Sequence, residues 1–222
     1  MVTGILVCIT CTDGSTKLVN VKYRNVKFYR TVLFQFNIEP SNMASRNNIK
    51  IISGALVCVD SNLRGDITIG AGTIIHPNVS IIAEAGPIVI GESCLIEEQT
   101  KIIHRLPLGQ PEPETPPILR IGSQNVFEVD CTVEAPKIGD SNVFESKCYV
   151  GSKVSVTSGC IIGAGCRLTA EQTLKDNTII YGEECHQRVG LDKPAPQTLQ
   201  LETLSKVLPN YHHLRRPNKK NQ

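Results

Sequence analysis

The sequence predicts an all-β solenoid, in which short strands wind around one axis and stack coil upon coil. The first observation is a large apolar residue that recurs at nearly every sixth position, twenty times between residues 51 and 180. These residues are Ile51, Val57, Leu63, Ile69, Ile75, Ile81, Ile90, Ile96, Ile102, Ile121, Phe127, Val133, Ile138, Phe144, Val150, Val156, Ile162, Leu168, Leu174 and Ile180. An α-helix repeats about every 3.6 residues and a strand about every 2, so neither explains this spacing. It is typical of a parallel β-helix of hexapeptide repeats.

The second observation is a small or β-branched residue four positions after each large one. This set comprises Ala55, Ser61, Ile67, Thr73, Val79, Ala85, Cys94, Thr100, Cys131, Cys148, Val154, Cys160, Cys166 and Thr178. We expect a triangular prism with three repeats per coil, in which both residue sets point inward. Twenty repeats give roughly six to seven coils, a prism about 30 Å long at about 4.8 Å per stacked strand. Asn125 and Asn142 occupy the small position one coil apart, which predicts an asparagine ladder.

Glycine directly follows the large residue in six repeats: Gly70, Gly91, Gly122, Gly139, Gly151 and Gly163. We expect glycine at these positions because the backbone bends at a corner or takes a positive φ angle.

The composition excludes several functional classes. The chain has 222 residues and a net charge of +2, so no global basic field indicates nucleic-acid binding. Five of its nine cysteines occupy the small inward position, where they are small buried side chains rather than a disulfide framework. This pattern favours a reducing cytoplasm. No segment has the roughly 20 apolar residues that span a bilayer, so we expect no direct membrane insertion.

Residues 1–42 do not share the repeat. They contain five of the ten Phe and Tyr residues of the chain. We expect this segment to be a disordered leader or a gene-model extension, with Met43 as the natural start. Cys8 and Cys11 form one CxxC without partner ligands, which does not predict a metal site. The predicted domains are the leader, the β-helix over 43–185, and a C-terminal region over 186–222.

Two interruptions break the repeat. Around Pro87, three extra residues lengthen one corner. The larger one is a proline-rich insert over 104–118, which must leave the prism because proline cannot donate a hydrogen bond to a sheet. The insert is either a solvated excursion or a loop that contacts a partner or covers a site.

After Tyr181 the repeat stops. Leu201, Leu204, Val207 and Leu208 fall at helical spacing and predict a helix over about 197–208, ended by Pro209. We expect this helix to pack along one prism face or to cover its end. The tail is basic over 212–220, which indicates a solvated disordered tail or a docking segment for an acidic partner.

Two motifs allow the sequence to be examined for a catalytic zinc site. Arg64-Gly65-Asp66 and the segment 90–99 resemble the γ-class carbonic anhydrase-like family, which implies three histidine ligands. The corresponding positions here are Ile103, Val129 and Glu134, and the first two side chains cannot bind zinc. His104 lies one residue out of register, so it points to the other side of its strand. In the same family's second motif, Glu97 and Glu98 replace glutamine and aspartate. The sequence therefore predicts no metal site.

An acyltransferase, the other activity known for such prisms, requires a general base. His76 follows a large inward residue and is predicted to point outward as a solvated side chain. His104 begins the insert and is in position to serve as a base, and His186 lies beyond the last repeat. No carboxylate is evidently placed to orient any of them. We therefore expect no catalytic residue and no cofactor, with a γ-carbonic anhydrase-like or acyltransferase enzyme as the alternative function.

A narrower resemblance comes from the segments outside the repeat. The sequences PQTLQL at 196–201 and LPNYHHL at 208–214, together with 81–92 and 158–164, resemble the dynactin subunit 6 family. The resemblance implies a left-handed β-helix and a non-catalytic structural and interaction subunit of the dynactin complex, in the cytoplasm and on the cytoskeleton.

It also implies a place at the pointed end of the actin-related filament. The implied partners are dynactin subunit 5 (as a heterodimer of β-helices), the p62 dynactin subunit and the pointed-end actin-related protein. Cargo adaptors would be engaged indirectly, in support of dynein-driven microtubule transport.

Overall fold

The computed structural model describes residues 4–10, 16–22, 47–106, 113 and 115–217, and the chain divides into two compact units, Met1–Met43 and Ala44–Gln222. In the first unit, β1 (Gly4–Thr10) pairs antiparallel with β2 (Thr16–Lys22). The sequence pattern does not predict this hairpin, and the disordered leader stays a prediction. That the segment extends the natural protein stays a prediction. The side chains of Cys8, Cys11 and Met43 lie outside the described residues.

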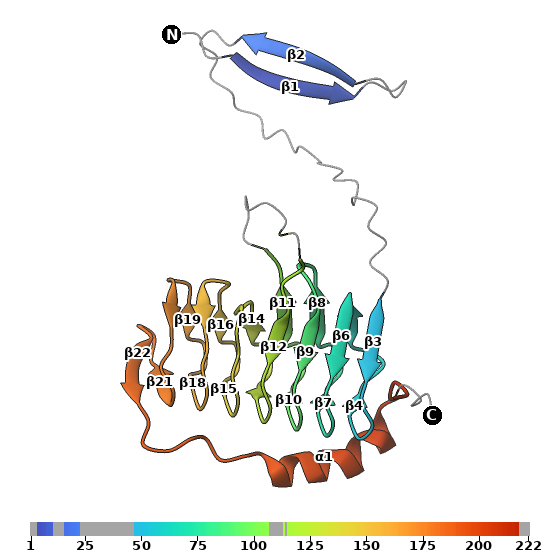
Figure 1. The fold of residues 1–222 in the computed structure, drawn as a ribbon, viewed down its shortest axis with the longest axis vertical. Coiled ribbons are helices and arrows are strands. Elements are labelled where there is room, and N and C mark those ends of the chain that lie inside the picture. The colour runs from blue at the N-terminus through green and yellow to red at the C-terminus, as the bar shows by residue number, and fades with distance from the viewer. Residues whose placement is uncertain (1–3, 11–15, 23–46, 107–112, 114, 218–222) are drawn as a thin grey trace. The chain divides into compact units, whose positions relative to one another are not determined.

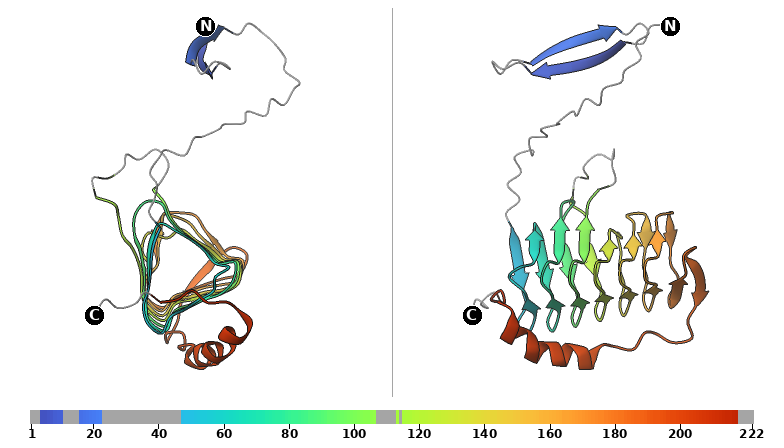
Figure 2. Two further views of the ribbon diagram at one scale, coloured as in Figure 1. Left: turned by 90° about the vertical axis from the view of Figure 1, so that its right-hand side faces the viewer. Right: turned by 180° about the vertical axis from the view of Figure 1, so that it is seen from behind.

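The second unit is a parallel β-solenoid of about seven coils with one C-terminal helix, as the sequence predicts (Figure 1). Seen along its axis, the coils superpose as a triangle (Figure 2). The first face contains β3 (Asn48–Ile51), β6 (Asp66–Ile69), β9 (Ile88–Ile90) and β12 (Leu119–Ile121). Bridges from Ile121 to Ile138 and from Ile138 to Val156 continue it toward β17 (Val154–Ser155), which pairs with β20 (Gln172–Thr173).

The other two faces complete each coil. The second face contains β4 (Leu56–Val57), β7 (Ile74–Ile75), β10 (Leu95–Ile96), β13 (Val126–Phe127), β15 (Val143–Phe144), β18 (Ile161–Ile162), β21 (Thr178–Tyr181) and β22 (His186–Val189). The third face contains β5 (Asn62–Arg64), β8 (Ser80–Ala83), β11 (Lys101–His104), β14 (Thr132–Val133), β16 (Tyr149–Val150) and β19 (Arg167–Leu168). Within the solenoid, all strand pairs are parallel except β21 with β22.

The core follows the six-residue repeat. All twenty predicted large residues are buried, and they fill the interior of the prism. Phe127 and Phe144 stack one coil apart, with ring centroids 4.6 Å apart and planes within 2° of parallel. The small positions are buried too, except Ala85 at the first interruption, which is half-buried. Apolar side chains stacked in this way stay out of water only while the neighbouring coils are present.

The predicted asparagine ladder is present, and it links three coils. Asn125 Nδ2 donates to the carbonyls of Gly122 and Gly139, each at 2.8 Å. Its Oδ1 accepts from the Asn142 backbone amide at 2.9 Å. Asn142 repeats the pattern one coil further, where it accepts from the Cys160 amide at 2.8 Å. Both side chains are fully buried, so these bonds satisfy backbone groups that water cannot reach.

The glycines that follow the large residues are required for close stacking. A Cβ atom on Gly91 would lie 2.6 Å from the carbonyl of Gly122, which in turn stacks on Gly139. These glycines do not have positive φ angles. The expectation of a positive φ angle is therefore wrong at these positions, and the close approach of successive coils explains the glycines.

The two interruptions pack against each other. The His104 carbonyl accepts from the backbone amides of Glu84 and Ala85, both at 2.9 Å. The Leu119 amide donates to the Pro87 carbonyl at 2.9 Å, so the end of the large insert rests on the small one. Residues 107–112 and 114 of the insert lie outside the described part of the chain.

Helix α1 (Thr198–Tyr211) packs along the second face beside β4, β7 and β10 (Figures 1 and 2). Leu208 is buried against Ile74, Leu95 and Val126, and Leu201 and Leu204 pack against the same cluster. Two details of the prediction are wrong. Val207 is 42% exposed, and Pro209 lies inside the helix rather than ending it. Proline lacks only one N–H here, and the His212 amide still bonds to the Leu208 carbonyl at 2.9 Å.

The start of the basic tail is ordered against the first coil, which corrects the prediction of a solvated tail for these residues. Leu214 forms an antiparallel bridge with Cys58, and the Val59 amide donates to the His213 carbonyl at 2.8 Å. The Arg215 guanidinium donates to the Ser61 carbonyl at 2.7 Å. The tail thus covers the edge of β4, while β22 covers β21 at the other end of the same sheet. Lys219 and Lys220 lie outside the described residues.

Candidate functional site

The three positions that correspond to zinc ligands do not fit a zinc ion. Ile103 points outward from β11, and Val129 is 37% exposed. Glu134 forms an ion pair with Arg105. Two aliphatic side chains and one carboxylate already held by a guanidinium cannot supply the nitrogen, sulfur or oxygen ligands that zinc requires. Within the described ranges, no group of three His, Cys, Asp or Glu residues is arranged to hold a metal.

His104 is held in place by the insert. It lies on the opposite side of β11 from Ile103, as its register predicts, and it is only 8% exposed. Its Nε2 lies 2.9 Å from the Pro117 carbonyl oxygen, so this nitrogen carries the proton and donates it. A nitrogen engaged in this way is not available as a general base. His186, at the start of β22, is exposed and lies 3.5 Å from Glu184.

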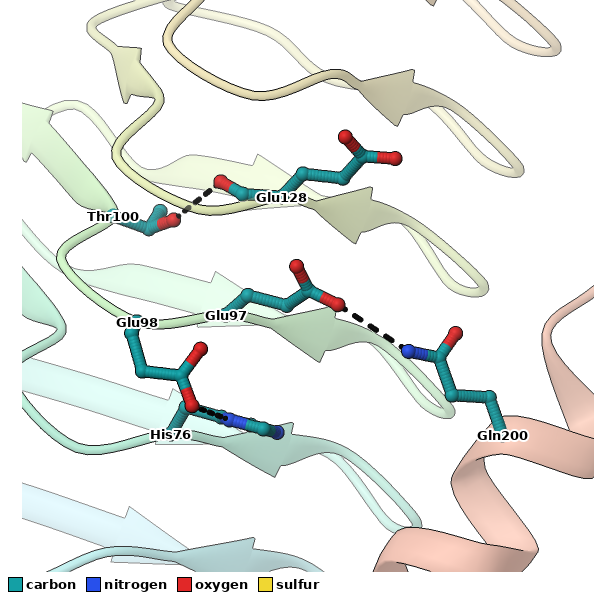
Figure 3. A network of polar contacts seen from close by, with 6 residues as sticks. All are labelled: His76, Glu97, Glu98, Thr100, Glu128 and Gln200. Atoms are coloured by element: carbon teal, nitrogen blue, oxygen red, sulfur yellow. Dashed lines mark hydrogen bonds and ion pairs between the residues drawn. The ribbon is translucent and has the colours of Figure 1, made fainter.

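His76 differs from its prediction. It is 8% exposed rather than solvated, and its Nδ1 lies 2.6 Å from Glu98 Oε1 on the next coil (Figure 3). A carboxylate therefore does orient this histidine. Its Nε2 is buried without a hydrogen-bond partner in the described structure, on the side that faces α1. Because this nitrogen is buried, the pair has the geometry of a structural contact.

The pKa values of the two neighbouring carboxyl groups, Glu97 and Glu98, shift in opposite directions. Burial, together with the nearby Glu128, raises the pKa of Glu97, which also accepts a hydrogen bond from Gln200 on α1 at 3.3 Å. For Glu98, burial is the largest single effect and raises the pKa, but the hydrogen bond from His76, a backbone hydrogen bond and the charges of His76 and His212 together outweigh it and lower the pKa of that carboxyl group. Figure 3 shows the Glu97 side chain pointing toward Gln200 on the helix, and the Glu98 side chain farther from the helix, against His76. This polar row therefore joins the solenoid to α1 beside the apolar cluster.

A groove of about 270 Å³ runs between the start of α1 and the corner before the second face. Leu56, Ile74 and Leu201 line its apolar part, and Gln124 and Ser205 lie among its polar groups. At the other end of the helix, Cys58 is fully buried in the same cluster as Leu208. Burial and then the charges of Asp60 and Glu98 raise the pKa of the Cys58 thiol to about 11. These groups can pack and bind, but they do not form a reactive centre.

Sequence reasoning missed the contacts that depend on tertiary structure. Because Ile75 pairs with Ile96, the register places His76 beside Glu97 of the next coil. The side chain of Glu98, one residue further along, bonds to His76. The insertion of three residues between these coils obscures the usual spacing of 18. Reading the repeat coil by coil could have found this row. The contact between Glu97 and Gln200 spans 103 positions, and no local pattern indicates it.

Comparison with known proteins shows both the fold and the family. No family model matches the chain. Among solved structures, a hexapeptide transferase family protein from Anaplasma phagocytophilum is similar, with a TM-score of 0.53 and 19% identity. The match covers 73% of this chain and 88% of that one. At this identity, the likeness concerns the fold alone.

Curated relatives are much more similar in sequence. Dynactin subunit 6 of Danio rerio is 51% identical over 182 residues, which cover 80% of this chain and 93% of the relative. Dynactin subunit 6 of Xenopus tropicalis is 51% identical, over 78% of this chain and 87% of the relative. The Nematostella vectensis protein of the same name is 47% identical, over 76% and 92%.

The coils, the inward ladders and the helix-covered face define a hexapeptide-repeat β-solenoid protein. Within this class, the sequence identities place the chain more narrowly. The chain belongs to the dynactin subunit 6 family.

Proposed function

We propose that this protein is a non-catalytic structural and interaction subunit of the dynactin complex. It would act at the pointed end of the actin-related filament, in the cytoplasm and on the cytoskeleton, and support cargo engagement in dynein-driven transport. Its direct partners would be dynactin subunit 5, the p62 subunit and the pointed-end actin-related protein. Cargo adaptors would be reached through the assembled complex.

The observation that carries this proposal is the 51% identity to proteins named dynactin subunit 6, over most of their length. The site chemistry supports it independently. Two of the three zinc-ligand positions are aliphatic, and the third carboxylate is paired with Arg105. A solenoid that lacks these ligands still presents a rigid surface for binding. No helix in the described part of the chain is long and apolar enough to cross a membrane.

The geometry of the histidines also favours a binding role. The Nε2 of His104 is engaged by a backbone carbonyl, and that of His76 is buried. A general base must come within hydrogen-bond reach of a substrate proton, and both imidazole rings are only 8% exposed.

Affinity purification of the tagged full-length chain from cells, followed by mass spectrometry, tests the proposal. We expect dynactin subunit 5, the p62 subunit and the pointed-end actin-related protein to be enriched over a bait of matched fold, such as a bacterial hexapeptide acyltransferase. The proposal fails if these subunits are recovered equally with both baits. It also fails if the purified chain holds stoichiometric zinc that is lost in His104→Ala.

A further inference from the structure

Four cysteines form one column at a corner of the solenoid. Cys131, Cys148 and Cys166 occupy the small inward position of successive coils, and Cys185 follows in the turn between β21 and β22. All four are free thiols. Successive coils stack at about 4.8 Å, within the range of about 4.4–6.8 Å between Cα atoms that a disulfide can bridge.

The last two members of the column, Cys166 and Cys185, are each held by backbone groups next to the other. Cys166 Sγ donates to the Gly182 carbonyl at 3.3 Å, and the Cys185 amide donates to the same carbonyl at 3.1 Å. In return, the Arg167 amide donates to Cys185 Sγ at 3.2 Å. The two thiols therefore lie side by side, with the end turn of the solenoid fixed around them.

The two thiols differ in their access to solvent. Cys166 is 2% exposed, whereas Cys185 is half-buried and reachable from solvent. Burial, and then the proximity of Cys185, raises the pKa of the Cys166 thiol. Cys185 Sγ lies against the Arg167 backbone, where it accepts from the amide at 3.2 Å and donates to the carbonyl at 3.6 Å. An accessible cysteine beside a buried one is the arrangement expected of a reacting and a resolving cysteine.

We propose that Cys185 and Cys166 form a hydroperoxide-sensitive modification site, at which oxidation joins the end turn of the solenoid to the preceding coil as a disulfide. The Cys185 thiolate attacks the terminal oxygen of a hydroperoxide and the O–O bond breaks, so that the sulfur becomes a sulfenic acid and the other oxygen leaves as an alkoxide or hydroxide, which takes a proton from water. The Cys166 sulfur then attacks the Cys185 sulfur, the S–O bond breaks, and the hydroxyl group leaves as water with the Cys166 proton. The peroxide is reduced and the two thiols are oxidised.

The same column provides an internal control. Cys131 and Cys148 are also one coil apart and interact with each other, but they are 0% and 1% exposed. Without an accessible member, this pair cannot meet the oxidant while the solenoid is folded. Cys131 and Cys148 should therefore stay reduced under conditions that oxidise Cys166 and Cys185.

The test uses the full-length chain, treated with hydrogen peroxide, unfolded in N-ethylmaleimide and digested with trypsin. We expect a disulfide between peptides 154–167 and 176–188, with the mass of two hydrogens lost, which dithiothreitol reverses. Because the first peptide also contains Cys160, the assignment is repeated in Cys160→Ser. In Cys166→Ser, oxidation should stop at a sulfenic acid on Cys185 that dimedone traps.

Two results of the disulfide mapping would overturn the proposal. One is a Cys166 thiol that remains fully alkylatable while Cys185 proceeds to a sulfinic acid. The other is a link between Cys131 and Cys148 that forms as fast as the one between Cys166 and Cys185. In Cys185→Ser, Cys166 should remain alkylatable, and its oxidation there would likewise contradict the assigned order.

Trypsin cleavage after Arg188 should be slower in the oxidised chain than in the reduced chain, and equal rates would contradict a joined end turn.

Discussion

Replacing Leu208 with alanine should weaken the attachment of α1 to the solenoid. Leu208 is the buried side chain of this helix, 5% exposed, and it packs against Ile74, Leu95 and Val126. The change removes three carbon atoms, at about 0.8 kcal/mol each. We therefore expect a loss of about 2 to 3 kcal/mol, the lower part of the range for buried leucine, because a helix on the surface can partly close the gap.

Urea unfolding measures this loss, and the thiol of Cys58 reports where it occurs. Cys58 is fully buried in the Leu208 cluster and is the sole cysteine of the tryptic peptide 51–64. Its alkylation in the folded protein should accelerate in Leu208→Ala. Leu199→Ala, on the same helix but 79% exposed, should stay within about 0.5 kcal/mol and leave Cys58 protected. Equal losses in the two variants would refute the assigned packing.

Four further predictions concern polar contacts. Because the pKa of Glu98 is lowered, its contribution to folding stability is present above about pH 4.5 and is lost as the pH falls through the pKa of the folded state. Glu98→Gln should therefore lower the free energy of unfolding by up to about 1 kcal/mol at pH 7, and by little at acid pH. Glu97 has a raised pKa, which costs stability at neutral pH, so Glu97→Gln should gain stability at pH 7 and lose that gain near pH 4.5 and below. Arg215→Ala should release the tail and speed hydrogen exchange at the Val59 amide, as measured by mass spectrometry. Asn142→Ala should cost about 2 to 4 kcal/mol in urea unfolding, because it leaves buried backbone groups of two coils unpaired.

Matched controls accompany these variants. Arg216→Ala changes an exposed neighbour of Arg215 and should leave the exchange at Val59 unchanged. Ser141→Ala, next to Asn142, changes a partly exposed hydroxyl and should cost little. A Glu97→Gln variant that is less stable at pH 7 would show that the charge of this carboxylate is favourable. A cost below about 1 kcal/mol for Asn142→Ala would show that the asparagine ladder contributes little to the stability of the solenoid.

The fold could be predicted from the sequence because one period determines it. Every coil repeats the same inward positions, so the twenty large residues identify the core without any long-range information. The helix follows for the same reason, since its leucines recur at helical spacing. The predicted end of the helix is wrong because a proline near the last turn, Pro209, removes one hydrogen bond without stopping the helix.

The contacts between distant segments could not be predicted in this way. The pairing of Leu214 with Cys58 depends on the exposed edge of β4, and the sequence does not specify which segment covers it. The same holds for Glu97 and Gln200. The argument against zinc could be made early because it requires only residue types at fixed positions, and Ile103 cannot be a ligand in any conformation.

Native mass spectrometry of the untagged chain, isolated from cytosol under mild conditions, tests the central claim most directly. If this solenoid is a binding scaffold, the chain should be found in a larger assembly that contains one copy of a second hexapeptide-repeat subunit for each copy of this chain. The masses should leave no room for bound zinc. A free homotrimer that carries stoichiometric zinc would contradict the account.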